Sequence, residues 1–149
     1  MQDLKELYQE VILDHNKNPR NFGSMDNPSC EAKGHNPLCG DRLKLYLKIN
    51  DDVIEDVRFE GQGCAISQAS ASLMTEALKG LTTIEAQALF DKVHLLLTDE
   101  RFDINTLPFL KLQVLGGVRA YPARVKCASL AWHTLIAALK HQPDIAKTE

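Results

Sequence analysis

Apolar and polar residues alternate from residue 42 to residue 49, and this period of two predicts a β-strand with one buried face. Residues 50–52 are all Asn or Asp, which favours a tight turn. Residues 53–60 predict the returning strand, with Val57 and Phe59 on the buried face. The pattern therefore predicts an antiparallel hairpin, whose first strand buries Leu43, Leu45, Leu47 and Ile49.

This predicted hairpin brings two cysteines together at its open end. With Asp51 and Asp52 at the centre of the turn, Cys39 lies opposite Cys64, and Asp41 lies beside them. Two thiols and a carboxylate that gather at one point suggest a metal site.

Elsewhere the apolar residues recur at helical spacing, and capping residues mark the ends of the segments. Thr82 and Glu85 form a capping box, Gly80 closes the preceding helix, and Pro122 suits the first turn of the last helix. We expect helices at 3–16, 65–79, 82–97, 108–117 and 122–141, a short strand at 30–36, and a polar connection at 98–107. This order predicts one α+β domain over residues 1–149, in which a small antiparallel sheet of about three strands packs against several helices.

The composition is ordinary for a globular protein, with 44% hydrophobic and 25% charged residues. No apolar run approaches the roughly 18 residues of a membrane span, and the N-terminal residues lack the features of a signal peptide. A net charge of -3 without a long basic block argues against nucleic acid as the main partner. Four cysteines without an export signal indicate a reducing compartment, where thiols serve metals or catalysis more often than disulfides. We therefore expect a cytoplasmic protein with neither a membrane nor a nucleic acid as partner.

Cys39, Asp41, Cys64 and Cys127 are the candidate metal ligands. Cys64 and Cys127 are predicted near the N-termini of helices, where free backbone N–H groups and the helix dipole favour a thiolate. Three thiolates and one carboxylate would complete a tetrahedral zinc shell; this donor set also suits iron and excludes magnesium and calcium. A coordinated thiolate must leave the metal before it can attack, and Cys39 lies in a predicted loop. We therefore expect Cys39 to be the reactive thiol and the other three residues to hold the metal.

Other interpretations of these residues stay open. Cys30 lies outside every motif, and we expect it to be a small apolar residue of the core. His35 lies four residues before Cys39 and is an alternative ligand. A purely structural zinc is a further alternative, although a chain of this length can fold without one.

The chain resembles the NifU/IscU-like iron–sulfur cluster assembly proteins, and the resemblance extends over nearly its whole length. It is carried by Asn-Pro-Leu-Cys-Gly-Asp at 36–41, Gly-Gln-Gly-Cys-Ala-Ile-Ser-Gln-Ala-Ser at 61–70 and Arg-Val-Lys-Cys-Ala-Ser-Leu-Ala-Trp at 124–132. Within this family the chain is most similar to the SufU branch. IscU-type scaffolds have a His just before the third cysteine, where this chain has Lys126. The segment from about Leu95 to Tyr121 is also longer than in IscU-type chains.

The resemblance implies a zinc-dependent, sulfurtransferase-like sulfur acceptor that works with a PLP-dependent cysteine desulfurase of the SufS type. It implies that Cys39, Asp41, Cys64 and Cys127 bind zinc and that Cys39 accepts the persulfide sulfur. Arg124, one helical turn before Cys127, would steady the thiolates or contact the partner.

Two other functions remain open at this point. One is a scaffold that binds iron or a transient [2Fe–2S] cluster and passes it to downstream iron–sulfur assembly proteins. The other is an adaptor with a structural zinc that activates the desulfurase. Whether the chain is itself an enzyme stays open.

Overall fold

The computed structural model describes residues 4–37, 40–107, 109–119, 121–140 and 146–147. Its sheet has the strand order β3-β2-β1-β4. β2 pairs antiparallel with both β1 and β3, and the two-residue β4 pairs in parallel with β1. The strands are β1 (Cys30–Asn36), β2 (Asp41–Asn50), β3 (Val53–Gln62) and β4 (Ala146–Lys147).

All helices except the first follow the three long strands in the chain and precede β4. They are α1 (Leu4–Lys17), α2 (Ala65–Leu78), α3 (Thr83–Thr98), α4 (Leu110–Gln113) and α5 (Pro122–Leu139), with 3₁₀ turns η1 (Ile104–Thr106) and η2 (Val114–Val118). The predicted capping box is present, because the Thr82 side chain accepts from the Glu85 N–H while the Glu85 carboxylate accepts from the Thr82 N–H. Pro108 and His141, at which two predicted helices begin and end, lie outside the described residues.

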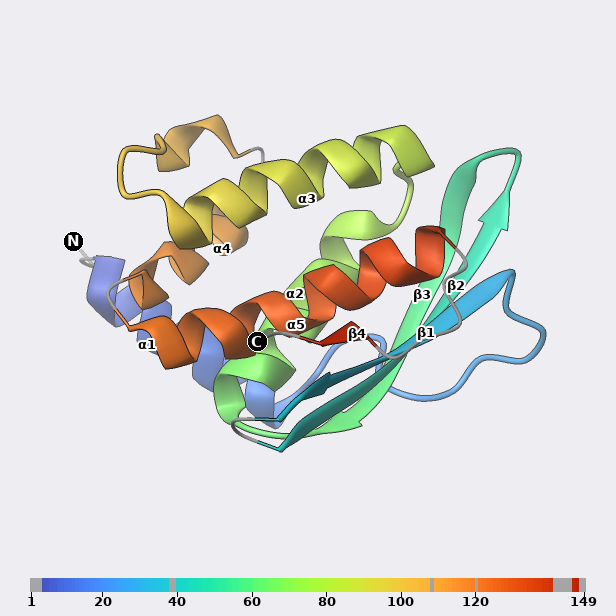
Figure 1. Cartoon of the computed structure of the whole chain (residues 1–149), viewed down its shortest axis with the longest axis horizontal. Helices are drawn as coiled ribbons and strands as arrows, with labels where there is room; N and C mark the ends of the chain where they lie inside the picture. The colour runs from blue at the N-terminus through green and yellow to red at the C-terminus, as the bar shows by residue number, and fades with distance from the viewer. Residues whose placement is uncertain (1–3, 38–39, 108, 120, 141–145, 148–149) are drawn as a thin grey trace.

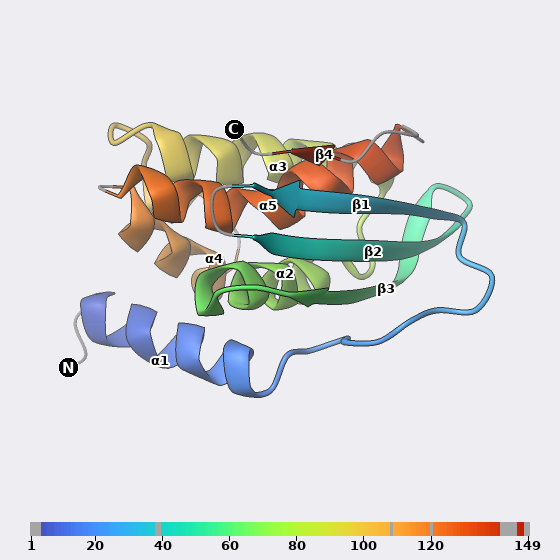
Figure 2. The same ribbon diagram turned by 60° about the horizontal axis from the view of Figure 1, so that its bottom comes forward.

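One face of the sheet is covered by α2 and α5, while α1 packs against α2 and α3 packs against α5 (Figures 1 and 2). The other face of β1, β2 and β3 carries no helix among the described elements (Figure 2). The architecture is therefore a helical layer on one side of a small antiparallel sheet, which confirms the predicted α+β fold. None of the described helices combines the length and the apolar character needed to cross a membrane.

The hairpin turn has the predicted centre, but the register beyond it differs from the prediction. Asp51 and Asp52 both have positive φ, as a two-residue turn of type I′ requires. Asn50 pairs with Val53 as expected, and a β-bulge next to Ile49 then shifts every later pair by one residue. The strand pairing that was expected to place Cys39 opposite Cys64 is therefore wrong by one position.

The bulge has a packing reason in β3. Ile54, Val57 and Phe59 are all completely buried, although Ile54 and Val57 are an odd number of residues apart. A regular strand would place these two side chains on opposite faces. The extra residue, Glu55, is exposed and lets both apolar side chains reach the core.

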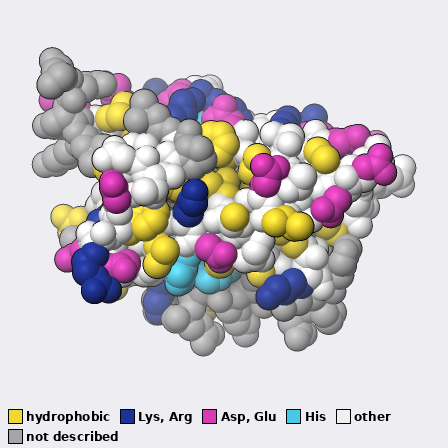
Figure 3. Space-filling model, turned by 90° about the horizontal axis from the view of Figure 1, so that it is seen from above, with side chains coloured by type: hydrophobic (Ala, Val, Ile, Leu, Met, Phe, Trp, Pro, Cys, Tyr) yellow, Lys and Arg dark blue, Asp and Glu magenta, His cyan; other side chains and the backbone are white. Residues whose placement is uncertain are grey.

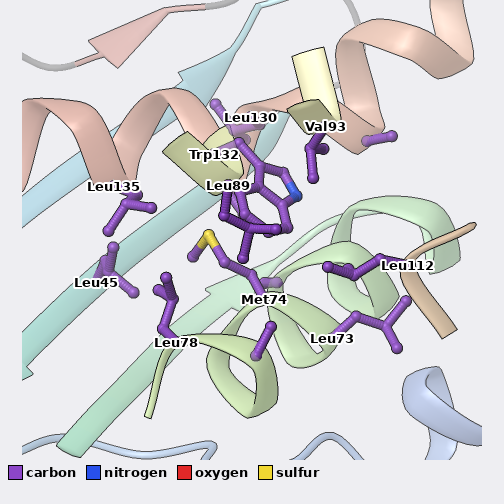
Figure 4. Packing of buried hydrophobic residues seen from close by; sticks show 14 of the residues in the cluster. Leu45, Leu73, Met74, Leu78, Leu89, Val93, Leu112, Leu130, Trp132 and Leu135 are labelled. Carbon is purple, nitrogen blue, oxygen red and sulfur yellow. The ribbon is translucent and has the colours of Figure 1, made fainter. Parts of the chain in front are cut away.

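The core lies between the sheet and the helices, and Trp132 of α5 is among its largest fully buried side chains. Figure 4 shows Trp132 close to Met74 of α2 and to Leu89 and Val93 of α3. Its indole nitrogen donates a 3.1 Å hydrogen bond to Ser70 Oγ, which satisfies its only polar atom. Cys30 is also buried, which confirms that it belongs to the core, and burial raises the pKa of its thiol.

Small residues bring α5 close to the sheet and to α2. A Cβ built on Gly34 of β1 would lie 2.1 Å from Thr134 Oγ1 of α5, so only glycine fits there. Ser70 of α2 donates a 2.6 Å hydrogen bond to the Ala128 carbonyl of α5. These contacts fix α5, and hence Cys127, relative to the sheet and to α2.

Candidate metal centre

Three predicted ligands from three different elements converge at one end of the sheet. Asp41 begins β2, Cys64 directly precedes α2, and Cys127 lies in α5. One potential ligand atom of each residue lies within 4.8 Å of those of the other two. The structure therefore brings together three of the four residues that the sequence nominates.

Asp41 is completely buried, and a hydrogen bond orients its carboxylate. Its Oδ1 accepts a 2.9 Å hydrogen bond from the Cys64 backbone N–H, and its Oδ2 lies 3.8 Å from Cys64 Sγ. A Cβ on Gly63 would lie 2.3 Å from this Oδ1. The absence of a side chain at residue 63 thus leaves the space that the Asp41 carboxylate occupies.

Cys64 is the N-cap residue of α2. Its Sγ accepts from the Ser67 backbone N–H at 3.4 Å, as the side-chain oxygen of an ordinary N-cap residue does. The N-terminus of α2 presents its free backbone N–H groups and its positive dipole end at this position. The sequence-based placement of Cys64 at a helix N-terminus is confirmed.

Cys127 is buried in the second turn of α5, which begins at Pro122. Only the first four N–H groups of a helix lack an intrahelical partner, and the dipole effect fades beyond the first turn. Cys127 therefore lies near the start of α5, as predicted, but beyond the first turn, where the helix dipole acts most strongly. Its Sγ accepts a hydrogen bond from Nδ2 of Asn36 at 3.7 Å.

Cys39 and His35 are the other two residues that the sequence offers as ligands. Cys39 lies outside the described residues. In the sequence it stands between Pro37, which follows β1, and Gly40, which precedes β2. The side chain of His35 points to the opposite face of the sheet from that of Asn36, because successive side chains of β1 alternate between faces. The alternative in which His35 completes this site is therefore wrong.

Arg124 occupies the first turn of α5, one turn before Cys127, and it is exposed. Its guanidinium carbon lies 4.8 Å from the ring centre of Tyr121. Burial raises the pKa of Tyr8 of α1, the Arg124 charge opposes this effect, and the charge of Cys64 adds to it. Arg124, Tyr121 and Cys64 therefore all lie near Tyr8.

Asn36 and Gly63 are functional candidates that the sequence reasoning did not single out. Both lie within motifs that carry the family resemblance, directly before or near a predicted ligand. Asn36 is completely buried on the inner face of β1, which the alternation of that strand indicates. Such a buried amide needs partners, and a thiolate is one that it can serve.

The donor set fits a soft or borderline metal ion. Two sulfur atoms and one carboxylate oxygen suit zinc or iron and do not suit calcium or magnesium. The Asn36 amide and the Cys64 N–H supply the outer hydrogen bonds that commonly orient ligating groups. The residues present thus fit a zinc ion and supply three of its ligands.

Comparisons with known proteins show which family the chain belongs to. The family model of the NifU-like N terminal domain matches residues 7–148. The zinc-dependent sulfurtransferase SufU of Bacillus subtilis is 42% identical over 133 residues, which cover 89% of this chain and 89% of that protein. The iron–sulfur cluster assembly scaffold protein IscU of Thermotoga maritima is 43% identical over 136 residues, covering 91% of this chain and 94% of that protein.

A solved structure shares the fold. It is that of an iron–sulfur cluster assembly scaffold protein for the SUF system from Fervidobacterium islandicum AW-1, with a TM-score of 0.82 and 38% sequence identity. The match covers 90% of this chain and 97% of that chain. The chain therefore belongs to the family of the NifU-like N terminal domain, whose relatives here serve iron–sulfur cluster assembly. Within that family it is a SufU-type member, which confirms the resemblance seen in the sequence.

Proposed function

We propose that this protein is a zinc-dependent sulfur acceptor that takes persulfide sulfur from a PLP-dependent cysteine desulfurase onto Cys39. The observation that carries the proposal is the convergence of Asp41, Cys64 and Cys127 within 4.8 Å at the strand end that follows Cys39 in sequence. The name of the Bacillus subtilis relative, a zinc-dependent sulfurtransferase, supports the same function. The cytoplasm and a SufS-type desulfurase remain the expected location and partner.

In this proposal Cys39, Asp41, Cys64 and Cys127 would hold the zinc ion. When bound, zinc supplies Lewis-acid chemistry that keeps ligating thiols deprotonated at neutral pH. Asp41 is fixed by the Cys64 N–H, and Cys127 is supported by the Asn36 amide, so these residues suit a holding role. Cys39 is left as the ligand that exchanges its bond.

The transfer of persulfide sulfur to Cys39 needs neither an oxidant nor a reductant. The Cys39 thiolate attacks the outer sulfur of the desulfurase persulfide, forming a new S–S bond. The S–S bond of the donor breaks, and the donor cysteine leaves as a thiolate. Arg124, exposed near the site, is proposed to steady these anions or to contact the partner.

Mass spectrometry tests the assignment. The zinc-loaded protein is incubated with a SufS-type desulfurase and cysteine, digested, and examined for peptides that gain the mass of one sulfur atom. We expect the gain on the Cys39 peptide and its loss in Cys39→Ser, whereas Cys30→Ala retains it because Cys30 lies in the core. A persulfide that persists in Cys39→Ser would reject the assignment.

A second candidate function is that of a cluster scaffold, because the Thermotoga maritima relative is named as one. Anaerobic reconstitution with iron and sulfide separates the two functions, since a [2Fe–2S] cluster absorbs visible light and zinc does not. The adaptor with a structural zinc predicts instead that desulfurase activation falls only as far as the folded fraction falls.

A further inference from the structure

A second surface feature lies behind the metal centre, on the sheet face that carries no helix. It is a depression of about 650 Å³ over the ends of β1, β2 and β3. Its outward-pointing side chains are mostly cationic or polar and come from two neighbouring cross-strand rows. They are Lys33, His35, Arg42, Lys44, Glu60 and Gln62, and we call this surface the cationic pocket.

The strand register places like charges directly opposite each other in this pocket. Lys33 of β1 pairs with Lys44 of β2, and His35 pairs with Arg42. Like charges at directly opposed positions destabilise a sheet. The fold therefore places one repulsive pair, Lys33 and Lys44, beside Arg42 at one end of an exposed face. Glu60 lies opposite Lys44 on its other side, so cations still outnumber carboxylates here, and this excess suits a ligand of opposite charge.

The charges of the cationic pocket are only partly neutralised within the chain. Lys44 Nζ lies 3.8 Å from a carboxylate oxygen of Glu31, and Glu60 accepts a hydrogen bond from the Tyr46 hydroxyl. Within the described part of the chain, Lys33 and Arg42 have no ion-pair partner, and both are exposed. Two solvated cations and a histidine are thus available to an incoming anion.

The position of the pocket relative to the metal centre suggests its use. Arg42 directly follows Asp41, and Gln62 lies two residues before Cys64, so the same strand ends present ligands inward and the pocket outward. An occupant of the pocket would therefore lie beside the β1–β2 connection without covering Asp41, Cys64 or Cys127.

We propose that the cationic pocket docks an acidic segment of a partner protein, through carboxylates that pair with Lys33 and Arg42. A protein segment is favoured over a small anion because the cations are spread along two neighbouring strands of an open face, which several carboxylates of one chain can span. The face over α3 offers no such arrangement: there Figure 3 shows acidic and basic side chains interspersed with apolar ones. The proposal does not require that sulfur transfer occurs.

Fluorescence anisotropy with a labelled peptide of six consecutive glutamates tests the proposal, with a peptide of six glutamines as the neutral probe. The zinc-loaded wild-type protein should bind the acidic peptide and not the neutral one. Raising the salt from about 0.1 M to about 1 M shortens the Debye length from about 10 Å to about 3 Å and should weaken this binding.

Two double variants locate the binding site. Lys33→Gln with Arg42→Gln should weaken peptide binding about fivefold, which is the size expected when two exposed ion pairs are lost. The control, Lys17→Gln with Lys92→Gln, removes the same charge from exposed lysines of α1 and α3 and should change binding less than twofold. The pocket variant should also keep its zinc and unfold at no lower temperature than wild type, since it relieves repulsion across the strands.

Three results would overturn the proposal: equal binding of both peptides, equal weakening in both double variants, or displacement of the peptide by citrate at lower concentration than by unlabelled peptide. The last result would assign the pocket to a small anion. None of these readouts involves Cys39, so the proposal and the proposed function can fail independently.

Discussion

Substituting Gly63 by alanine gives a sharp test of how the metal centre is built. The added Cβ would lie 2.3 Å from Asp41 Oδ1, 2.9 Å from its Cγ and 3.0 Å from its Cβ. Asp41 is completely buried, so its carboxylate has no solvent to move into. The carboxylate must therefore give up the 2.9 Å hydrogen bond from the Cys64 N–H.

The expected loss of stability follows from that hydrogen bond. A hydrogen bond to a charged group contributes about 1.5–3 kcal/mol to stability. For a protein of this size, a loss of about 2 kcal/mol lowers the unfolding temperature by about 4–8 °C. Zinc affinity should fall as well, because the same displacement moves a predicted ligand.

The assay is thermal unfolding of the zinc-free protein, followed by zinc quantification after reloading. Gln62→Ala is the matched control, since Gln62 is exposed and its side chain points to the other face of the sheet. In an Asp41→Ala background, the two closest contacts are gone, and Gly63→Ala should cost about 1–2 kcal/mol less than in wild type. Additive effects of the two substitutions would refute the reasoning.

Three further predictions concern stability. Arg119→Ala removes hydrogen bonds from the guanidinium to the carbonyls of Leu96 and Glu100 near the end of α3, so calorimetry should show a loss of about 2–3 kcal/mol with unchanged zinc content. The hydrogen bond to Glu60 raises the pKa of Tyr46 from 10.0 to about 12. Between these two pH values only the unfolded state loses the Tyr46 proton, so the free energy of unfolding falls as the pH rises from 10.0 to about 12. Tyr46→Phe should remove that part of the pH dependence in denaturant titrations, and a slope equal to wild type would contradict it. Burial lowers the pKa of His15 below 6.5, so the stability linked to its neutral form is lost as pH falls below that value; His15→Gln should flatten this acidic limb.

Local patterns predicted much of the fold. The alternation in β2 and the Asp51-Asp52 turn specified the hairpin, and the capping box of Thr82 and Glu85 specified the start of α3. These signals depend on a few neighbouring residues, so they can be read without the tertiary structure. The bulge also had a local signal, since Ile54 and Val57 are both strongly apolar at an odd spacing.

Other features depend on contacts between segments far apart in the sequence. Asn36 contacts Cys127 across 91 residues of sequence. Arg119 donates to the Leu96 carbonyl of α3 across 23 residues. Packing of α5 on the sheet sets these contacts, and no local pattern encodes that geometry. Cys127 was nominated beside Asp41 from residue chemistry and supported by the family resemblance, but no local pattern showed that the two residues meet.

Zinc X-ray absorption spectroscopy of the zinc-loaded protein tests the central claim most directly. If Cys39, Cys64, Cys127 and Asp41 hold the ion, the spectrum will show three sulfur neighbours at about 2.3 Å and one oxygen neighbour at about 2.0–2.2 Å. The sulfur count will fall by one in Cys39→Ser and stay at three in Cys30→Ala. A shell with fewer than three sulfur atoms in the wild-type protein, or one unchanged in Cys39→Ser, would contradict the account.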